Sequence, residues 1–186
     1  HKSFAGKIKI YNEYGPTETS VGCMIYEFNP GETEQPAVPV GKAIDGMRIF
    51  LLDSSLHPIK ENETGEIFIA GIGVARGYLN NNELTNKKFL TDPFFPNEKM
   101  YKSGDLAKFL PDGNIEFLGR VDDQVKIRGY RIEPGEIENK LKEFAGVKDC
   151  VVITHNYSEQ ITRLIAYIVP NKKIQTEDLK NFSASF

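Results

Sequence analysis

The sequence predicts an α+β chain that changes character once along its length. Short runs rich in Ile, Val, Phe and Tyr, separated by turns with Gly and Pro, fill residues 21–120. This pattern is typical of a β-rich, distorted barrel-like unit of short, mostly antiparallel strands. After Arg120, two short strands lead into an amphipathic helix and two longer strands, which is typical of a small α+β layer. We therefore expect two domains, residues 1–121 and residues 122–186.

Each element of the first part has its own signal. The composition of β-branched and aromatic residues favours strands over residues 7–14, 21–28, 47–53 and 65–71. A loop punctuated by Pro and Gly spans residues 29–46. A short helix is expected over residues 81–90, with Asn82 as its N-cap. Residues 107–120 are expected to form a hairpin, because the Asp-Gly pair in "PDGN" favours a tight turn.

The second part follows a strand, helix, strand, strand order. A pair of short strands is expected over residues 124–132. The helix over residues 134–146 begins at a proline that the first turn tolerates and stops at Gly146. Its apolar face contains Ile137, Leu141 and Phe144. Two longer strands and the start of another helix follow, over residues 147–156, 162–170 and 175–182.

Composition excludes several classes of protein. The net charge of −3 argues against nucleic-acid binding, since domains that bind a phosphate backbone are usually basic. No apolar run approaches the ~20 residues that a membrane span requires. Cys23 and Cys150 lie far apart and outside any metal-binding spacing, which predicts two buried thiols in a reducing compartment. We expect a cytoplasmic protein that binds neither nucleic acid nor membrane.

The stretch "YNEYGPTETS", residues 11–20, is the first candidate site. Its Gly-Pro turn would display Thr17 and Glu18. A glutamate suits Mg²⁺, which prefers hard oxygen ligands, and a threonine hydroxyl suits a phosphate. Tyr14 would offer a ring face to a base. The local chemistry by itself favours the alternative that Tyr14 belongs to the core and the Thr-Glu pair caps a turn.

Three later segments carry weaker signals. "IAGIGVARGYL" fails as a dinucleotide fingerprint, because Arg76 stands at the third glycine position, so its glycines are interpreted as sites of sharp turns. Asp105, after a glycine at the start of a strand, suits either a diol such as ribose or a loop cap. Arg120 and Asp122 lie at the expected domain boundary, where a solvated linker and a hinge are both open interpretations.

In combination these segments are specific. "NEYGPTE", "GEIFIAGIGVARGYL", "YKSGDLAKFLPDGNIEFLGR" and "GRVDDQVKIRGYRIEPGEIE" resemble, in order and spacing, the later core motifs of nonribosomal peptide synthetase adenylation domains. These domains belong to the acyl-adenylate-forming superfamily. The resemblance covers nearly the whole chain. It implies that residues 1–121 are the end of the large adenylation subdomain and residues 122–186 most of the small mobile C-terminal subdomain.

The resemblance implies an ATP- and Mg²⁺-dependent ligase that activates an amino acid as aminoacyl-AMP. The product would pass to the phosphopantetheine thiol of a peptidyl carrier domain, among neighbouring modules of an antibiotic-producing synthetase. The phosphate loop would precede residue 1, and the motif with the catalytic lysine would follow residue 186. The chain alone is therefore expected to be truncated at both ends and inactive. An acyl-CoA or aryl-acid ligase, or a non-catalytic excised module, remains an alternative.

Carried onto matching positions, the resemblance assigns roles to individual residues. Thr17 and Glu18 would be the catalytic pair, with Glu18 holding Mg²⁺. The ATP or AMP site would comprise Asn12, Tyr14, Gly15, Thr17, Asp105 and Arg120. Tyr14 would stack on adenine beside Asn12, and Asp105 would accept from the ribose hydroxyls near Arg120. Asp122 would be the hinge, and Gly129 would line the thiol tunnel.

Four further positions bear on specificity or depart from the family. The substrate pocket would include Glu13, Val21 and Gly22, a triplet that resembles those of asparagine-activating domains. A buried carboxylate would equally accept a basic side chain, which is the second choice. Ser103 stands where the family more often has Thr, and this change keeps the hydroxyl.

Overall fold

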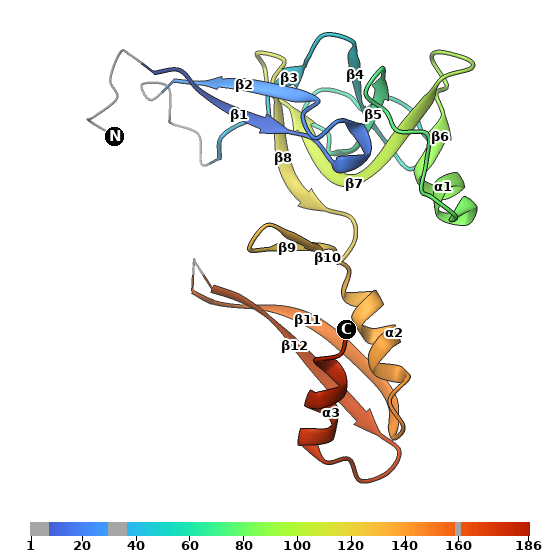
Figure 1. Ribbon diagram of the computed structural model, residues 1–186. Helices are drawn as coiled ribbons and strands as arrows, with labels where there is room; N and C mark the ends of the chain where they lie inside the picture. The colour runs from blue at the N-terminus through green and yellow to red at the C-terminus, as the bar shows by residue number, and fades with distance from the viewer. Residues whose placement is uncertain (1–7, 30–36, 159–160) are drawn as a thin grey trace. The chain divides into compact units, whose positions relative to one another are not determined.

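The computed structural model describes residues 8–29, 37–158 and 161–186, and its strands pair in antiparallel fashion (Figure 1). The chain divides into two compact units, the first ending at Val121 and the second beginning at Asp122. The predicted class, a β-rich part followed by a small α+β part, is confirmed. Residue 7 of the first predicted strand and residues 30–36 of the predicted loop lie outside the described residues.

Two antiparallel sheets build the first unit. The smaller sheet has the order β1-β2-β3 and comprises Ile10–Tyr14 (β1), Met24–Phe28 (β2) and Lys42–Ala43 (β3). The larger has the order β4-β5-β7-β6, with β8 paired to β7, and comprises Met47–Leu52 (β4), Gly65–Gly71 (β5), Phe89–Thr91 (β6), Lys99–Phe109 (β7) and Ile115–Arg120 (β8). Figure 1 shows this sheet curling along β7, as in a half-barrel.

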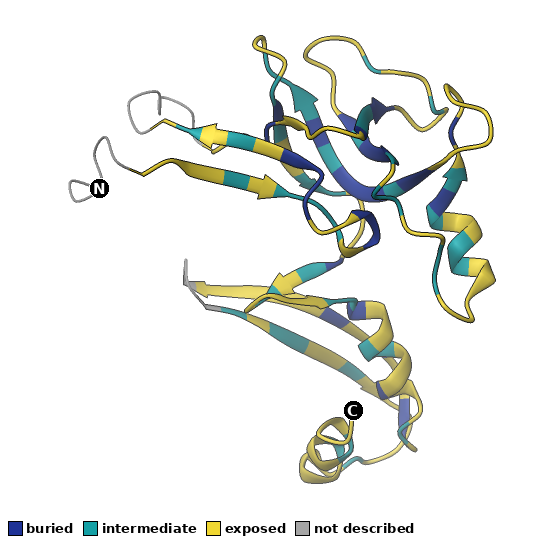
Figure 2. Cartoon of the chain, turned by 45° about the horizontal axis from the view of Figure 1, so that its top comes forward, coloured by how far each residue is buried: buried dark blue, intermediate teal, exposed yellow. Residues whose placement is uncertain are grey.

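The core of the first unit explains why β5 is apolar without alternation. Ile67 and Ile69 pack into a cluster with Cys23, Met24 and other buried residues. Phe68 and Ala70 point to the other face, into a second cluster. Because both faces of β5 are buried, every position from 67 to 70 is apolar. Figure 2 shows buried stretches, in dark blue, on several strands of the first unit.

Both cysteines are free and buried, as the sequence predicts. Cys23 is fully buried beneath the turn that follows β1. Burial raises the pKa of its thiol to about 11, so the thiolate is scarce at neutral pH. Cys23 therefore serves the core as a small apolar side chain.

The N-cap of the helix after β5 lies one residue earlier than predicted. The N-cap of Asn82–Lys88 (α1) is Asn81, whose side-chain oxygen accepts the Leu84 N–H at 3.0 Å. The prediction of Asn82 was wrong, because the cap is the residue whose side chain reaches the free N–H three positions ahead. The helix also ends at Lys88, since the apolar residues after it pair with β7 as β6.

Asp105 lies in the middle of β7 and not at a strand start. The strand begins at Lys99 and passes Gly104 through a break in its register with β5. Gly104 has a φ of 81°, which glycine adopts without steric cost. The glycine that suggested a strand start thus marks a bulge.

The second unit packs two helices on a hairpin. It contains the short strands Val125–Ile127 (β9) and Tyr130–Ile132 (β10), the hairpin of Val147–Ser158 (β11) and Ile161–Pro170 (β12), and the helices Pro134–Lys142 (α2) and Thr176–Ser183 (α3). The predicted apolar face of α2 packs on the buried side chains of β11. Gly146 follows at a φ of 119°, where the chain turns into β11.

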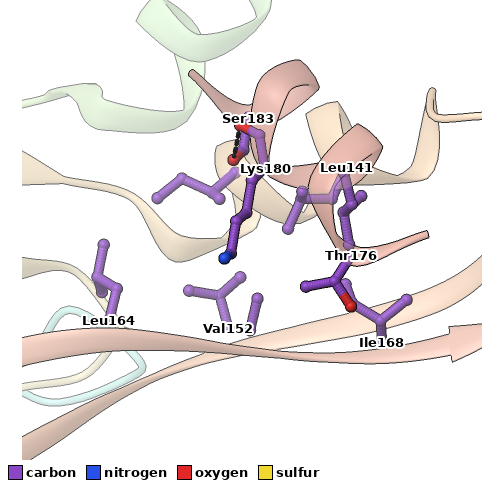
Figure 3. Close-up of a pocket in the computed structure, with 10 residues that line it drawn as sticks. Leu141, Val152, Leu164, Ile168, Thr176, Lys180 and Ser183 are labelled. Atoms are coloured by element: carbon purple, nitrogen blue, oxygen red, sulfur yellow. Dashed lines mark hydrogen bonds between the residues drawn. The ribbon is translucent and has the colours of Figure 1, made fainter. Parts of the chain in front are cut away.

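A cavity of about 340 Å³ lies inside this unit between the two helices and the hairpin. Figure 3 shows Lys180 and Ser183 of α3 on one side of it, with Val152, Leu164 and Ile168 of the hairpin opposite. Its lining is mainly apolar. Among the described residues, no helix is long and apolar enough to cross a membrane.

Candidate functional site

Asp105 and Arg120 meet because of a bulge in the β7–β8 hairpin. Near the turn, the residues pair as Phe109 with Ile115 and Ala107 with Phe117. The register then shifts by one residue, so that Asp105 pairs with Arg120 across the strands. The Arg120 guanidinium forms an ion pair with Oδ1 of Asp105. Both side chains are mostly shielded from solvent, so this charge pair is screened little by water.

Tyr14 contacts the same carboxylate from the smaller sheet. Its phenol O–H donates to Oδ2 of Asp105, so each carboxylate oxygen has a donor. The ring also packs against the main core. Burial, and next the negative charge of Asp105, raise the pKa of Tyr14 well above its usual value. The phenol therefore stays protonated and remains a donor at neutral pH.

The hydroxyl of Ser103 fixes the backbone that carries Asp105. Ser103 Oγ donates to the Ile67 carbonyl at 2.7 Å and accepts the Asp105 N–H at 3.0 Å. The side chain is buried, with 2% of the residue exposed. These two bonds fill the gap that the bulge leaves in the ladder between β5 and β7. They explain why a hydroxyl residue suits this position.

The turn after Tyr14 aims Thr17 and Glu18. A 3-10 turn, Thr17–Thr19 (η1), follows Pro16 directly. A Cβ on Gly15 would lie 2.2 Å from the Val21 carbonyl oxygen, so only glycine lets the two backbone segments approach this closely. Thr17 is exposed, whereas Glu18 is buried, with 8% of the residue exposed.

The Glu18 carboxylate is held by Tyr78, from the loop between β5 and α1. The Tyr78 phenol O–H donates to Glu18 Oε1 at 2.6 Å. The Ala75 N–H donates to the Glu18 main-chain carbonyl at 2.8 Å. Burial, and next the hydrogen bond to Glu18, raise the pKa of Tyr78 well above its usual value. The loop "IGVARGYL" therefore holds the turn.

The three predicted pocket positions lie at the end of the β1–β2 hairpin. The Glu13 carboxylate lies directly over Gly22, because a Cβ on Gly22 would be 1.7 Å from Glu13 Oε1. The absence of a side chain at Gly22 thus makes room for the carboxylate. Val21 has a φ of 68° and is 68% exposed, so its side chain stands out of the turn.

Asn12 is fixed by one hydrogen bond from its amide. Its Nδ2 donates to the Pro39 carbonyl at 2.7 Å, which ties β1 to the segment before β3. The residue is half-buried. The structure therefore brings Tyr14, Asp105 and Arg120 into direct contact, and places Asn12 on the same strand as Tyr14.

The remaining two predicted positions belong to the second unit. Asp122 is its first residue and is exposed. Gly129 and Arg128 form the two-residue turn between β9 and β10, with φ values of 84° and 53°. Two positive φ values in a two-residue hairpin loop are typical of a type I′ turn. No atom lies within 4 Å of a Cβ built on Gly129.

The residues present suit a cation that arrives with phosphates. Within the described ranges, no three His, Cys, Asp or Glu side chains gather to hold a metal by themselves. Mg²⁺ is usually bound by one or two carboxylates together with substrate phosphates. A single positioned carboxylate at Glu18, beside the Thr17 hydroxyl, fits that mode of binding.

Sequence reasoning missed Tyr78. The only signal was its place at the end of the quoted "GVARGYL" segment, which was interpreted as a set of turns. A tyrosine in a loop carries no sign of its partner. The contact becomes visible only when the loop is folded back on η1.

Comparison with known proteins finds a matching family model and close relatives. A family model described as "AMP-binding enzyme" matches residues 1–79. The chain is 50% identical to tyrocidine synthase 3 of Brevibacillus parabrevis over 179 residues, which are 96% of this chain and 3% of that protein. It is 49% identical to bacitracin synthase 3 of Bacillus licheniformis over 181 residues, 97% of this chain and 3% of that protein.

A solved structure has the same fold. It is NpsA-ThdA, an artificially fused adenylation-PCP di-domain synthetase from Klebsiella oxytoca, with a TM-score of 0.78 and 34% identity. The match covers 97% of this chain and 34% of that chain. The chain thus spans a small share of each relative's length. Residues 1–79 match the AMP-binding enzyme family, and by its relatives and its fold the chain corresponds to part of a nonribosomal peptide synthetase adenylation domain.

Proposed function

We propose that the chain forms the nucleotide corner of a larger enzyme that activates an amino acid with ATP. A carboxylate oxygen of the amino acid attacks the α-phosphorus, the bond to pyrophosphate breaks, and aminoacyl-AMP forms. The observation that carries this proposal is the Asp105 carboxylate, held between the Tyr14 phenol and the Arg120 guanidinium. A carboxylate acceptor that is fixed in this way is suited to a sugar diol.

The other residues of the corner would position charge. Asp105 would accept from the ribose hydroxyls, with Arg120 holding its carboxylate in place and Tyr14 presenting its ring to the adenine. Asn12 would meet the edge of the base, and the Gly15 turn would aim the Thr17 hydroxyl at a phosphate oxygen. Glu18 would supply the protein's carboxylate to the cation; Mg²⁺, when bound with the nucleotide, neutralises phosphate charge. Phosphoryl-type transfer depends mostly on such positioning and charge neutralisation.

In the second half-reaction, the carrier thiol would attack the acyl carbonyl. The thioester forms, AMP leaves, and the thiol loses its proton. We propose that Asp122 is the hinge about which the second unit turns between the two steps, and that Gly129 lies along the path of the phosphopantetheine arm. The carrier domain and the neighbouring modules would be the partners. The names of the relatives, multi-step peptide synthases and an adenylation-PCP di-domain, support this second step.

For the substrate, we propose L-asparagine. The carboxylate of Glu13 lies over Gly22, where it would accept hydrogen bonds from the NH₂ of a carboxamide. A basic amino acid is the competing choice, since the same carboxylate would pair with a cation.

The test is ATP–pyrophosphate exchange by the complete adenylation domain that contains this chain, with Asn, Gln, Asp, Arg, Lys and Orn as substrates. We expect exchange that depends on Asn. Equal exchange with Arg, Lys or Orn would refute asparagine, and exchange with none of the six would refute both substrate choices. Loading of a carrier domain, compared with loading of free CoA, decides the acceptor. The 186 residues alone are expected to show no exchange.

A further inference from the structure

Tyr78 forms a hydrogen bond to Glu18 and has no role in the reaction proposed above. Its phenol O–H donates to Glu18 Oε1 at 2.6 Å, a short bond of the kind formed with a charged acceptor. Glu18 itself is buried, with 8% of the residue exposed. A buried carboxylate on a turn has several rotamers, and a donor to one named oxygen selects among them.

Tyr78 is itself held by α1 and β6. Its N–H donates to Thr85 Oγ1 at 2.9 Å, and that hydroxyl donates to the Asn81 carbonyl at 2.8 Å. Its ring packs edge-on against Phe89, with the centroids 5.4 Å apart. The Tyr78 side chain is therefore held in one position, which a positioning role requires.

The backbone of the same loop holds the turn from the other side. The Ala75 N–H donates to the Glu18 carbonyl at 2.8 Å, and Ser20 Oγ donates to the Gly73 carbonyl at 3.2 Å. Gly77 lets the loop pass α1 closely, since a Cβ there would lie 2.4 Å from Thr85 Cγ2. Main chain and side chain of Glu18 are thus fixed by one segment, residues 71–78.

We propose that Tyr78 is a positioning residue, whose phenol fixes the Glu18 carboxylate in the orientation that meets the divalent cation of bound nucleotide. This inference rests on the function proposed above. Partners that orient a metal-binding side chain typically affect metal affinity as the ligand itself does, though less strongly. Tyr78 contacts neither nucleotide nor metal in this role and acts only through Glu18.

The test is the Mg²⁺ dependence of ATP binding, measured calorimetrically on the complete adenylation domain. The variant Y78F removes the hydroxyl and keeps the ring that packs on Phe89. We expect Y78F to raise the half-saturating Mg²⁺ concentration by about 10-fold. The affinity for ATP in EDTA should stay within about 2-fold of the wild type, because Tyr78 makes no contact with the nucleoside in this role.

The matched control is Y11F. The Tyr11 phenol donates to Glu27 at 3.2 Å on the exposed side of the β1–β2 hairpin, so this variant loses the same kind of bond away from the site. We expect its Mg²⁺ titration and thermal unfolding to match those of the wild type. Thermal unfolding of Y78F then reports any general loss of structure separately.

A double-mutant cycle with E18Q separates positioning from packing. If Tyr78 acts through Glu18, then Y78F adds little to the effect of E18Q. An equal cost of Y78F in both backgrounds, or an unchanged Mg²⁺ titration in Y78F, would overturn the inference while leaving the proposed function intact. A wild-type domain that binds no ATP would overturn the proposed function, and this inference with it.

Discussion

The two units present their predicted functional residues in opposite ways. In the first, Tyr14 and Arg120 both form hydrogen bonds to Asp105, and the three residues lie on three different strands. Glu18 accepts a hydrogen bond from Tyr78, which lies in a loop. In the second, Asp122 and Gly129 are exposed, and a Cβ built on Gly129 would contact no described residue beyond its chain neighbours. A site built into the fold couples stability to activity. Positions outside the packed core allow activity to change with little loss of stability.

The largest effect is expected from D105A, which removes the carboxylate that Tyr14 and Arg120 share. Truncating one partner of a largely shielded ion pair should cost about 3 kcal/mol in the free energy of unfolding. The ribose acceptor is lost as well, so exchange should fall by about 100-fold or more. Urea denaturation and ATP–pyrophosphate exchange measure the two effects on the same preparation.

The control for this prediction is D105N, which keeps the size of the side chain and one acceptor oxygen. It should retain more stability than D105A and still lose most exchange. If the free energy of unfolding of D105A equals that of the wild type, then Asp105 does not stabilise the first unit, and the proposed link between stability and activity is wrong.

Two glycines in the same turn separate backbone fit from specificity. G15A places a Cβ 2.2 Å from a backbone carbonyl oxygen that cannot move freely, so we expect a loss of about 2 kcal/mol or more in unfolding free energy. G22A meets only the end of the flexible Glu13 side chain. G22A should therefore unfold close to the wild type but displace the carboxylate and change amino-acid preference. Denaturation curves measure the loss of stability, and exchange with the panel of amino acids measures the change in preference. Equal destabilisation by G15A and G22A would contradict the prediction.

Most of the first unit could be predicted from sequence because its signals are local. The strand β5 and the "PDGN" hairpin follow from composition and turn residues. The partnership of Asp105 with Arg120 does not. The register near the turn, continued without a break, would pair Asp105 with Gly119 and turn Arg120 to the opposite face. One extra residue in β8 brings the charges together, and nothing in "NIEFLGR" marks it.

The same limit applies to Ser103 and Tyr78. A resemblance to family motifs supplied the expected roles of Tyr14, Glu18 and Asp105, but composition and spacing did not. The hydroxyl of Ser103 completes a gap that exists only because β7 bulges at Gly104. Tyr78 reaches Glu18 across 60 residues of sequence. Such contacts depend on register and loop path, which single-sequence patterns do not determine.

The variant G129A tests whether an exposed position of the second unit affects activity with little loss of stability. An alanine at a φ of 84° is strained by about 1 kcal/mol, and its methyl group meets no neighbour. We expect exchange to stay within about 2-fold of the wild type, while carrier loading falls roughly 10-fold because the thiol path is altered. The two half-reactions, measured separately, check this. A parallel fall in both would place Gly129 in the first step and contradict its assignment to the second.

The smallest effect is expected from D149N, on the surface of the second unit. Lys142 donates to Asp149 at 2.9 Å, and that bond, with the Cys150 N–H next, holds the pKa of Asp149 below its usual value. A lowered folded-state pKa contributes stability above the unfolded-state value near 3.8, and this contribution is lost as pH falls through the folded pKa. Because both groups are exposed, solvent screens the pair, and melting temperatures of D149N and wild type should differ by only about a few degrees at pH 7. The difference should shrink further in 1 M salt, where the Debye length is about 3 Å, and as the pH falls below 3.8 through the folded-state pKa. A difference in melting temperature that persists at low pH and high salt would mean that Asp149 stabilises the second unit through packing. Exposed positions of this unit would then contribute more to its stability than we expect.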